Sequence, residues 1–102
     1  MPILVLFTGN ITKDDYEAIR KEVHWEDQLP PGALFHTAAF DQNGYAHVAD
    51  VWESEMQMND FVQSRLIPAF QKMKVNPPNV EVFPTHNINA YEGLSRYTLR
   101  NK

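Results

Sequence analysis

Asp50 and Trp52 are the two residues whose types and spacing most directly suggest chemistry. They lie two apart in residues 45–53, a run with the alternating composition of a strand. Residues two apart on a strand share a face, so the carboxylate and the indole should lie side by side. A desolvated carboxylate is suited to take a proton as a general base. The structural alternative is that Asp50 is a satisfied hydrogen-bond acceptor and Trp52 is core.

Two histidines flank a hairpin signal and are further candidates. His36 and His47 lie on either side of Asp41-Gln42-Asn43-Gly44. A loop with an even number of residues would place both histidines on the face opposite Asp50, as diagonal neighbours roughly 7–8 Å apart. Two imidazoles without a third ligand at a secure spacing do not define a metal site, so we predict none.

These residues must be positioned by four strand-like and two helix-like segments. Thr12 and Ser54 have the composition of helix N-caps, and Gln57 completes a capping box with Ser54. Pro68 should kink the second helix or divide it in two. The predicted strands are residues 3–8, 33–40, 45–53 and 80–84, and the predicted helices are residues 13–25 and the stretch from Ser54 to Met73.

The resulting order of strand, helix, strand, strand, helix, strand predicts an α+β, ferredoxin-like domain with an antiparallel sheet. Two helices cover one face of such a sheet, and neither face is plainly polar here. We therefore predict a homodimer that pairs sheet to sheet. Residues 1–90 form the domain, and residues 91–102 form a polar, basic tail that is mobile or docks on the partner subunit. His86, on the last strand, would be distant from His36 within one subunit and near it across the dimer.

Composition excludes several classes of function. All thirteen acidic residues precede residue 93, whereas three of the nine basic residues follow it. An acidic body argues against binding nucleic acid, which depends on Lys and Arg contacts to phosphate. No apolar run approaches the roughly 20 residues that cross a bilayer, so we predict no membrane partner. The absence of cysteine fits a cytoplasmic location.

Four stretches of the sequence resemble a known group of proteins. These are Leu29-Pro30-Pro31-Gly32 with Leu34-Phe35-His36, Asp50-Val51-Trp52-Glu53-Ser54, Arg65-Leu66-Ile67-Pro68-Ala69, and His86-Asn87. With the element order, they resemble the dimeric α+β barrel superfamily, in particular small uncharacterised members akin to the antibiotic biosynthesis monooxygenase domain. The resemblance matches Trp52 to the family's tryptophan and Asn10 to an asparagine near the end of the first strand. Relatives that degrade haem carry a histidine on the second helix, where this chain has Asp60-Phe61-Val62, so we expect no haem.

The resemblance implies cofactor-independent oxygenation or isomerisation of a small aromatic or polycyclic compound. The ligand would lie in an apolar cavity between sheet and helices, against Phe35, Trp52 and Asn10. Asp50 would orient it or take a proton, with His36 and His86 as further catalytic candidates. The alternative is a non-catalytic homodimeric scaffold or ligand-binding module. A cavity with Asp50 and Trp52 at its wall would favour an enzyme.

Overall fold

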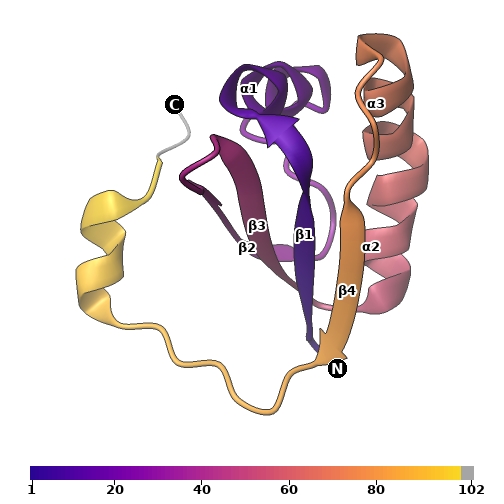
Figure 1. The fold of residues 1–102 in the computed structure, drawn as a ribbon. Helices are drawn as coiled ribbons and strands as arrows, with labels where there is room; N and C mark the ends of the chain where they lie inside the picture. Colours follow the sequence, from indigo (N-terminus) through magenta and orange to yellow (C-terminus); the bar gives the residue numbers. More distant parts are fainter. Residues whose placement is uncertain (100–102) are drawn as a thin grey trace.

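The computed structural model describes residues 1–99, so Arg100 and Lys102 of the predicted basic tail lie outside the described residues. Four antiparallel strands form one sheet in the order β2-β3-β1-β4, with helices packed on one of its faces (Figure 1). The strands are β1 (Ile3–Thr12), β2 (Ala33–Phe40), β3 (Tyr45–Trp52) and β4 (Asn79–Pro84). The helices are α1 (Lys13–Glu22), α2 (Glu55–Phe61) and α3 (Ile67–Met73). This confirms the predicted α+β, ferredoxin-like arrangement.

Both helix starts follow from the residues that cap them. The Thr12 hydroxyl accepts a hydrogen bond from the Asp15 N–H at 3.1 Å. The Ser54 hydroxyl accepts one from the Gln57 N–H at 3.2 Å. These bonds satisfy N–H groups that have no partner within the first turn of a helix. Both predicted caps are therefore confirmed.

The second helical stretch is divided before Pro68, as predicted. A π-helical turn, Val62–Leu66, joins α2 to α3. Proline lacks the N–H of a regular helical hydrogen bond, and its ring crowds the preceding turn. A wider π turn at this point accommodates the proline while the chain remains helical on both sides.

The end of α1 turns Trp25 into the core. The His24 N–H bonds to the Lys21 carbonyl and the Trp25 N–H to the Arg20 carbonyl, which is the pairing of a Schellman motif. His24 takes the left-handed conformation that the motif requires, with φ of 57°. The helix consequently ends earlier than residue 25, the predicted end, and Trp25 becomes a buried residue.

The β2–β3 hairpin closes through a bulge, so its loop has an odd number of residues. Asp41 and Tyr45 form the closing pair, and the Gly44 N–H donates to the Asp41 carbonyl at 2.9 Å. Gly44 has a φ of 82°, which glycine adopts without strain. A type I turn followed by a left-handed glycine is a standard three-residue hairpin connection. The extra residue shifts the alternation of β2 by one position relative to the even loop that we predicted.

The predicted faces of two site residues, His36 and Phe35, are wrong because of this shift. His36 lies in register with Asp50 and faces the helices, rather than sharing the outer face with His47. The predicted diagonal pair of histidines is therefore split between the two faces of the sheet. Phe35 lies in register with Val51 on the outer face, the face that no helix covers.

The described chain beyond β4 adds no further strand to the sheet. It runs past the sheet in an irregular path and ends in a short 3-10 helix, Glu92–Tyr97, which stands beyond β2 (Figure 1). Tyr91, Tyr97 and Leu99 are among its exposed large side chains. Over residues 1–99, no helix combines the length and the apolar character needed to span a membrane.

Candidate functional site

A buried carboxylate on the central strand β3 is the start of a hydrogen-bonded chain. Asp50 is 3% exposed. One of its oxygens lies 2.7 Å from Nδ1 of His36, and the other accepts from Nε1–H of Trp52 at 3.2 Å. Two donors offset the large cost of burying a carboxylate away from water. The site thus begins as a satisfied polar group inside the core.

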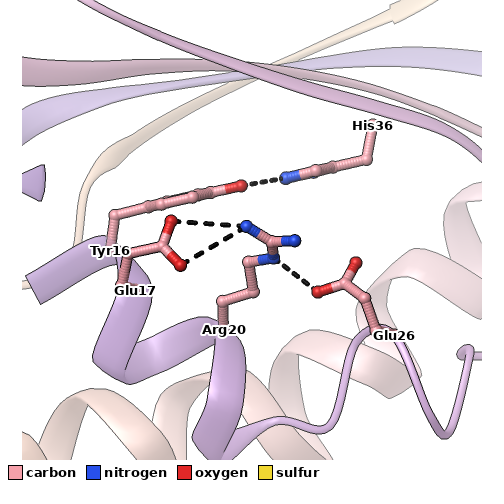
Figure 2. A network of polar contacts seen from close by, with 5 residues as sticks. All are labelled: Tyr16, Glu17, Arg20, Glu26 and His36. Atoms are coloured by element: carbon pink, nitrogen blue, oxygen red, sulfur yellow. Dashed lines mark hydrogen bonds and ion pairs between the residues drawn. The ribbon is translucent and has the colours of Figure 1, made fainter. Parts of the chain in front are cut away.

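The chain continues from His36 to Tyr16 on α1. The Tyr16 hydroxyl lies 2.6 Å from Nε2 of His36. The two ring planes are within 2° of parallel, and Figure 2 shows the rings end to end rather than face to face. An ionised Asp50 can only accept, so a neutral His36 carries its proton on Nδ1 and accepts at Nε2. In this tautomer Tyr16 is the donor, and the hydrogen-bonded chain runs Trp52–Asp50–His36–Tyr16.

Arg20 and two glutamates surround the outer end of this chain. The Arg20 guanidinium lies 6.0 Å from the centre of the Tyr16 ring. Its Nη1 is 3.3 Å from a carboxylate oxygen of Glu17, and its Nε donates to Glu26. Figure 2 shows Arg20 held between the two carboxylates beside Tyr16 and His36. One cation paired with two anions leaves this end of the site with a net negative charge.

Burial strengthens the hold of Tyr16 on its proton. Desolvation raises the pKa of the Tyr16 phenol to about 12, with Glu17, Glu26 and Asp50 adding to the rise and Arg20 opposing it. A phenol with this pKa keeps its proton at neutral pH. Tyr16 is therefore a hydrogen-bond donor and a source of a proton, not a standing phenolate.

The raised pKa gives a direct prediction for a pH titration. The chain has four tyrosines, and we expect the absorbance of one to change only near pH 12, later than a tyrosine with the ordinary pKa of about 10. Since the folded state holds this proton more tightly than the unfolded state, Tyr16 should stabilise the fold below about pH 10 and cease to do so as the pH rises through about 12. Ultraviolet absorbance titration of wild type and Tyr16→Phe measures this. A late transition that persists in the variant would assign it to another tyrosine.

An apolar cavity lies beside the hydrogen-bonded chain. This inner cavity has a volume of about 80 Å³ and has Asp50, His36 and Tyr16 in its wall. The rest of its lining is almost entirely apolar and includes Phe7, Ile19, Val23, Ala46, Val48 and Leu66. Trp52 is not part of the lining, since it is 1% exposed and packs in the core behind Asp50.

A larger groove lies on the outer side of the same residues. This outer groove, of about 550 Å³, runs between α1, β2 and the C-terminal segment. Its apolar lining includes Leu29, Leu34, Phe35, Leu94, Tyr97 and Leu99. The inner cavity and the outer groove share Tyr16, Arg20, Trp25 and His36, so these four residues stand between the two spaces.

The structure brings together some of the predicted site residues and separates others. Asp50, Trp52 and His36 meet in one chain of hydrogen bonds. Asn10 is exposed and lines neither the inner cavity nor the outer groove. His86 is also exposed and follows β4 instead of lying on it, at the sheet edge opposite β2.

Sequence reasoning missed Tyr16, Arg20 and Trp25. Tyr16 and Arg20 lie four apart on α1, a spacing that places them on one face of a helix. Trp25 packs against His36 with ring centres 4.7 Å apart and also contacts Trp52 and Phe61. The helical spacing gave a signal for the first two residues, whereas Trp25 depends on the chain reversal at the end of α1.

The described residues offer no metal site. Over residues 1–99, no group of three or more His, Cys, Asp or Glu side chains is placed to hold a metal ion. Asp50 has a single imidazole beside it, and that imidazole is bound by Tyr16 on its other nitrogen. The arrangement is suited to moving a proton along the chain.

Comparisons with known proteins find solved structures that share this fold. No family model matches the sequence, and no curated protein sequence matches it. A provisionally named antibiotic biosynthesis monooxygenase from Chloroflexus aurantiacus superposes with a TM-score of 0.61 over 87% of this chain and 98% of its own, at 12% identity. A protein of the same provisional name from Nitrosomonas europaea gives 0.61 over 83% and 90%, at 7% identity.

SnoaB from Streptomyces nogalater, a cofactor-independent oxygenase, is a further structural neighbour. It gives a TM-score of 0.59 over 85% of this chain and 93% of its own, at 14% identity. At such identities the likeness establishes the fold and not the activity. The chain has the fold of antibiotic biosynthesis monooxygenase-like domains, which confirms the resemblance found in its sequence.

Proposed function

We propose that this protein binds a small, largely apolar compound with a hydroxyl or carbonyl oxygen and moves a proton at Tyr16 and His36. The observation that carries the proposal is the buried chain Trp52–Asp50–His36–Tyr16, which ends between an apolar cavity and a groove. Convergent polar groups at the wall of an apolar pocket are typical of small-molecule sites. The proposal treats Asp50 as a positioning residue and Tyr16 and His36 as the groups that meet the ligand.

The protonation states define how the chain would work. Asp50 holds the Nδ1–H of His36, which leaves Nε2 free to accept a proton. A substrate proton would pass to the Tyr16 oxygen while the Tyr16 proton passes to Nε2 of His36. The resulting imidazolium would be stabilised by the carboxylate of Asp50, as in other carboxylate–histidine pairs. This transfer needs no free phenolate, in keeping with the Tyr16 pKa of about 12.

The charges near Tyr16 restrict the class of ligand. Glu17 and Glu26 outnumber Arg20, and both are engaged with it. A carboxylate or phosphate ligand would have to lose its water beside these acids, which is unfavourable. The site therefore suits a neutral phenol, quinol, ketone or lactone.

Two reaction classes can use such a proton relay without a cofactor, and the second of them also consumes dioxygen. In isomerisation, the proton that leaves one carbon returns to another, with no net change in electrons. In oxygenation, a carbon acid R₂CH₂ and O₂ give R₂C=O and H₂O, with four electrons leaving carbon and four entering dioxygen. The fold shared with SnoaB supports the oxygenase class by analogy.

The test is binding and turnover of neutral aromatic probes by the wild type and Tyr16→Phe. The chain's two tryptophans, Trp25 and Trp52, both lie at the site, so their indole N–H signals in NMR spectra report binding. We expect phenol, a naphthoquinol and a lactone to shift the Trp25 signal, and benzoate to do so less. Tyr16→Phe should retain binding and lose about 10²–10⁴-fold in turnover of the probe that reacts.

The alternative function predicts a different result. A non-catalytic scaffold would leave both indole signals unmoved by every probe in the wild type. It draws support from the completeness of the network, because in residues 1–99 no buried side-chain nitrogen or oxygen lacks a hydrogen-bond partner. Absence of binding by the wild type would overturn the proposed function and leave the scaffold.

We also propose that the protein acts as a homodimer that pairs through the outer face of the sheet. One row across this face is apolar on all four strands, and the next is mixed. The apolar row is Phe35, Val51, Leu4 and Phe83, and the mixed row is Thr37, Ala49, Leu6 and Glu81. A second copy with the same pattern can cover such a face by two-fold symmetry.

Phe83 and Val80 provide a matched test of the dimer. They are 45% and 47% exposed on the same edge strand, with Phe83 in the apolar outer row and Val80 on the opposite face. Phe83→Lys should weaken dimerisation by about 10- to 100-fold, because an apolar ring is lost from the interface. Val80→Lys should leave it unchanged. Sedimentation over a range of micromolar concentrations measures both, and a monomeric wild type would refute the dimer.

Two earlier predictions depend on this dimer. A contact between His36 of one subunit and His86 of the other requires β2 and β4 to approach across the interface. Docking of the C-terminal segment on the partner would cover Tyr91 and Leu99, which are 74% and 69% exposed in the isolated chain. Both remain predictions that a structure of the dimer would test.

A further inference from the structure

The inner cavity is too small for the organic ligand proposed above. An apolar cavity that holds benzene or xenon measures about 150 Å³, whereas the inner cavity measures about 80 Å³. An aromatic compound must therefore lie in the outer groove, whose volume of about 550 Å³ suits it. The inner cavity needs a different occupant or none.

Water is a poor occupant of the inner cavity. A buried water needs about two to four polar partners. Five lining side chains carry polar atoms, and four of them are already bound to one another or to the glutamates outside the lining. The fifth, Trp25, offers only a single indole N–H. Asp50 binds His36, His36 binds Tyr16, and Arg20 binds Glu17 and Glu26. The remaining surface offers little besides hydrocarbon, which favours a small apolar molecule.

The position of the inner cavity points to what such a molecule would do. Tyr16 and His36 belong to the walls of both spaces. A ligand oxygen bound to Tyr16 from the outer groove would therefore stand a few atoms from whatever occupies the inner cavity. Trp25 also belongs to both linings.

We propose that the inner cavity binds dioxygen, while the organic substrate lies in the outer groove on the other side of Tyr16 and His36. Dioxygen is small, uncharged and apolar, and so matches the volume and lining of the cavity. The volume and lining of the cavity alone support the binding of dioxygen, whereas the role of dioxygen as a reactant rests on the proposed function. The arrangement would hold the two reactants of an oxygenase in adjoining compartments.

The experiment uses the paramagnetism of dioxygen. Methyl relaxation rates of the full-length protein are measured under nitrogen and under oxygen. We expect the enhancement of methyl relaxation at Ile11, Ile19 and Val23, which line the cavity, to exceed several-fold that at Ile3 and Val5, which are also buried but do not line it. Equal enhancement at both sets would overturn the proposal.

Variants that fill the cavity provide the control. Ala46→Leu places a larger side chain in the cavity lining, and Ala46→Val fills it in part should the leucine variant not fold. Both should reduce the enhancement at Ile19 and Val23, the leucine more strongly. Ala18→Leu makes the same change on α1 outside the lining and should leave the enhancement intact. An enhancement that survives both Ala46 variants would refute binding in the cavity.

Binding of the organic probes separates this inference from the proposed function. Ala46→Leu should shift the Trp25 indole signal with phenol as the wild type does, because the outer groove is unchanged. The wild type could show the oxygen-induced enhancement of methyl relaxation but bind none of the organic probes. That result would refute the proposed function and leave dioxygen binding in place. Probe binding without enhancement would refute only dioxygen binding.

Discussion

Asp50→Asn is expected to reverse the direction of the hydrogen-bonded chain while the fold is retained. In the wild type both carboxylate oxygens accept, one from His36 and one from Trp52. An asparagine amide has a single oxygen, and the Trp52 indole can only donate, so the amide NH₂ must face Nδ1 of His36. The imidazole proton then moves to Nε2, which would donate to Tyr16 and no longer accept from it.

A reversed chain cannot receive the substrate proton. We expect turnover of any reactive probe to fall by about 10²–10⁴-fold in Asp50→Asn, because the wrong tautomer removes the base. The direct measurement is the ¹⁵N NMR shifts of the His36 ring, which distinguish the two tautomers without an assay. Binding of neutral probes in the outer groove should persist.

A second carboxylate–histidine pair supplies the matched control. Asp41 lies 2.8 Å from Nε2 of His47 on the exposed end of the β2–β3 hairpin. Asp41→Asn should change the ring signals of His47 and leave those of His36 and the turnover intact. Unchanged His36 ring shifts in Asp50→Asn would show that the assigned direction of the chain is wrong.

Local signals in the sequence were enough to predict the elements and their order. Thr12 and Ser54 were recognisable caps, and Pro68 marked the break in the second helix. Each depends on contacts within about one helical turn, which a short sequence window contains. The ferredoxin-like order then followed from the number and sequence of the elements.

The errors arose where one residue changed the direction of the chain. The bulge at Gly44 moved His36 from the outer face to the partner position of Asp50. A one-residue shift exchanges the faces of a whole strand. An error of one residue in the length of the loop therefore placed His36 on the wrong face of the sheet. Asp41 followed by Asn43-Gly44 is a signal for the three-residue loop, since the Asp41 side chain accepts from the Asn43 N–H.

Trp25 illustrates a second limit of the sequence. Its place in the core depends on the left-handed conformation of His24, a residue that takes this conformation far less often than glycine. Helical periodicity gives no sign of such a reversal. The pairing of His36 with Tyr16 is likewise a contact between elements twenty residues apart, which the sequence order does not reveal.

Trp52→Phe is expected to lower the free energy of unfolding by about 2–4 kcal/mol. Trp52 is 1% exposed, so a smaller ring leaves unfilled space around it. The change also removes one of the two donors to the buried carboxylate of Asp50. Domains of this size have total stabilities of about 5–15 kcal/mol, so urea denaturation followed by circular dichroism, at one protein concentration, should resolve the loss.

Trp25→Phe makes the same chemical change in the same aromatic cluster. The Trp25 ring packs against Trp52 and Phe61, but it does not donate to Asp50. We therefore expect it to cost about 1–2 kcal/mol, less than the change at position 52. Equal losses would mean that packing alone, and not the bond to Asp50, accounts for the role of Trp52.

A double-mutant cycle between Trp52→Phe and Asp50→Ala isolates that bond, because an asparagine at position 50 would still accept from the indole. Each single variant disturbs the contact between the indole and the carboxylate, so the two losses should not add. We expect the double variant to be more stable than the sum of the single effects predicts, by about 1 kcal/mol or more. Additivity to within about 0.5 kcal/mol would show that the two side chains do not interact. The chain would then begin at Asp50, with Trp52 a core residue alone.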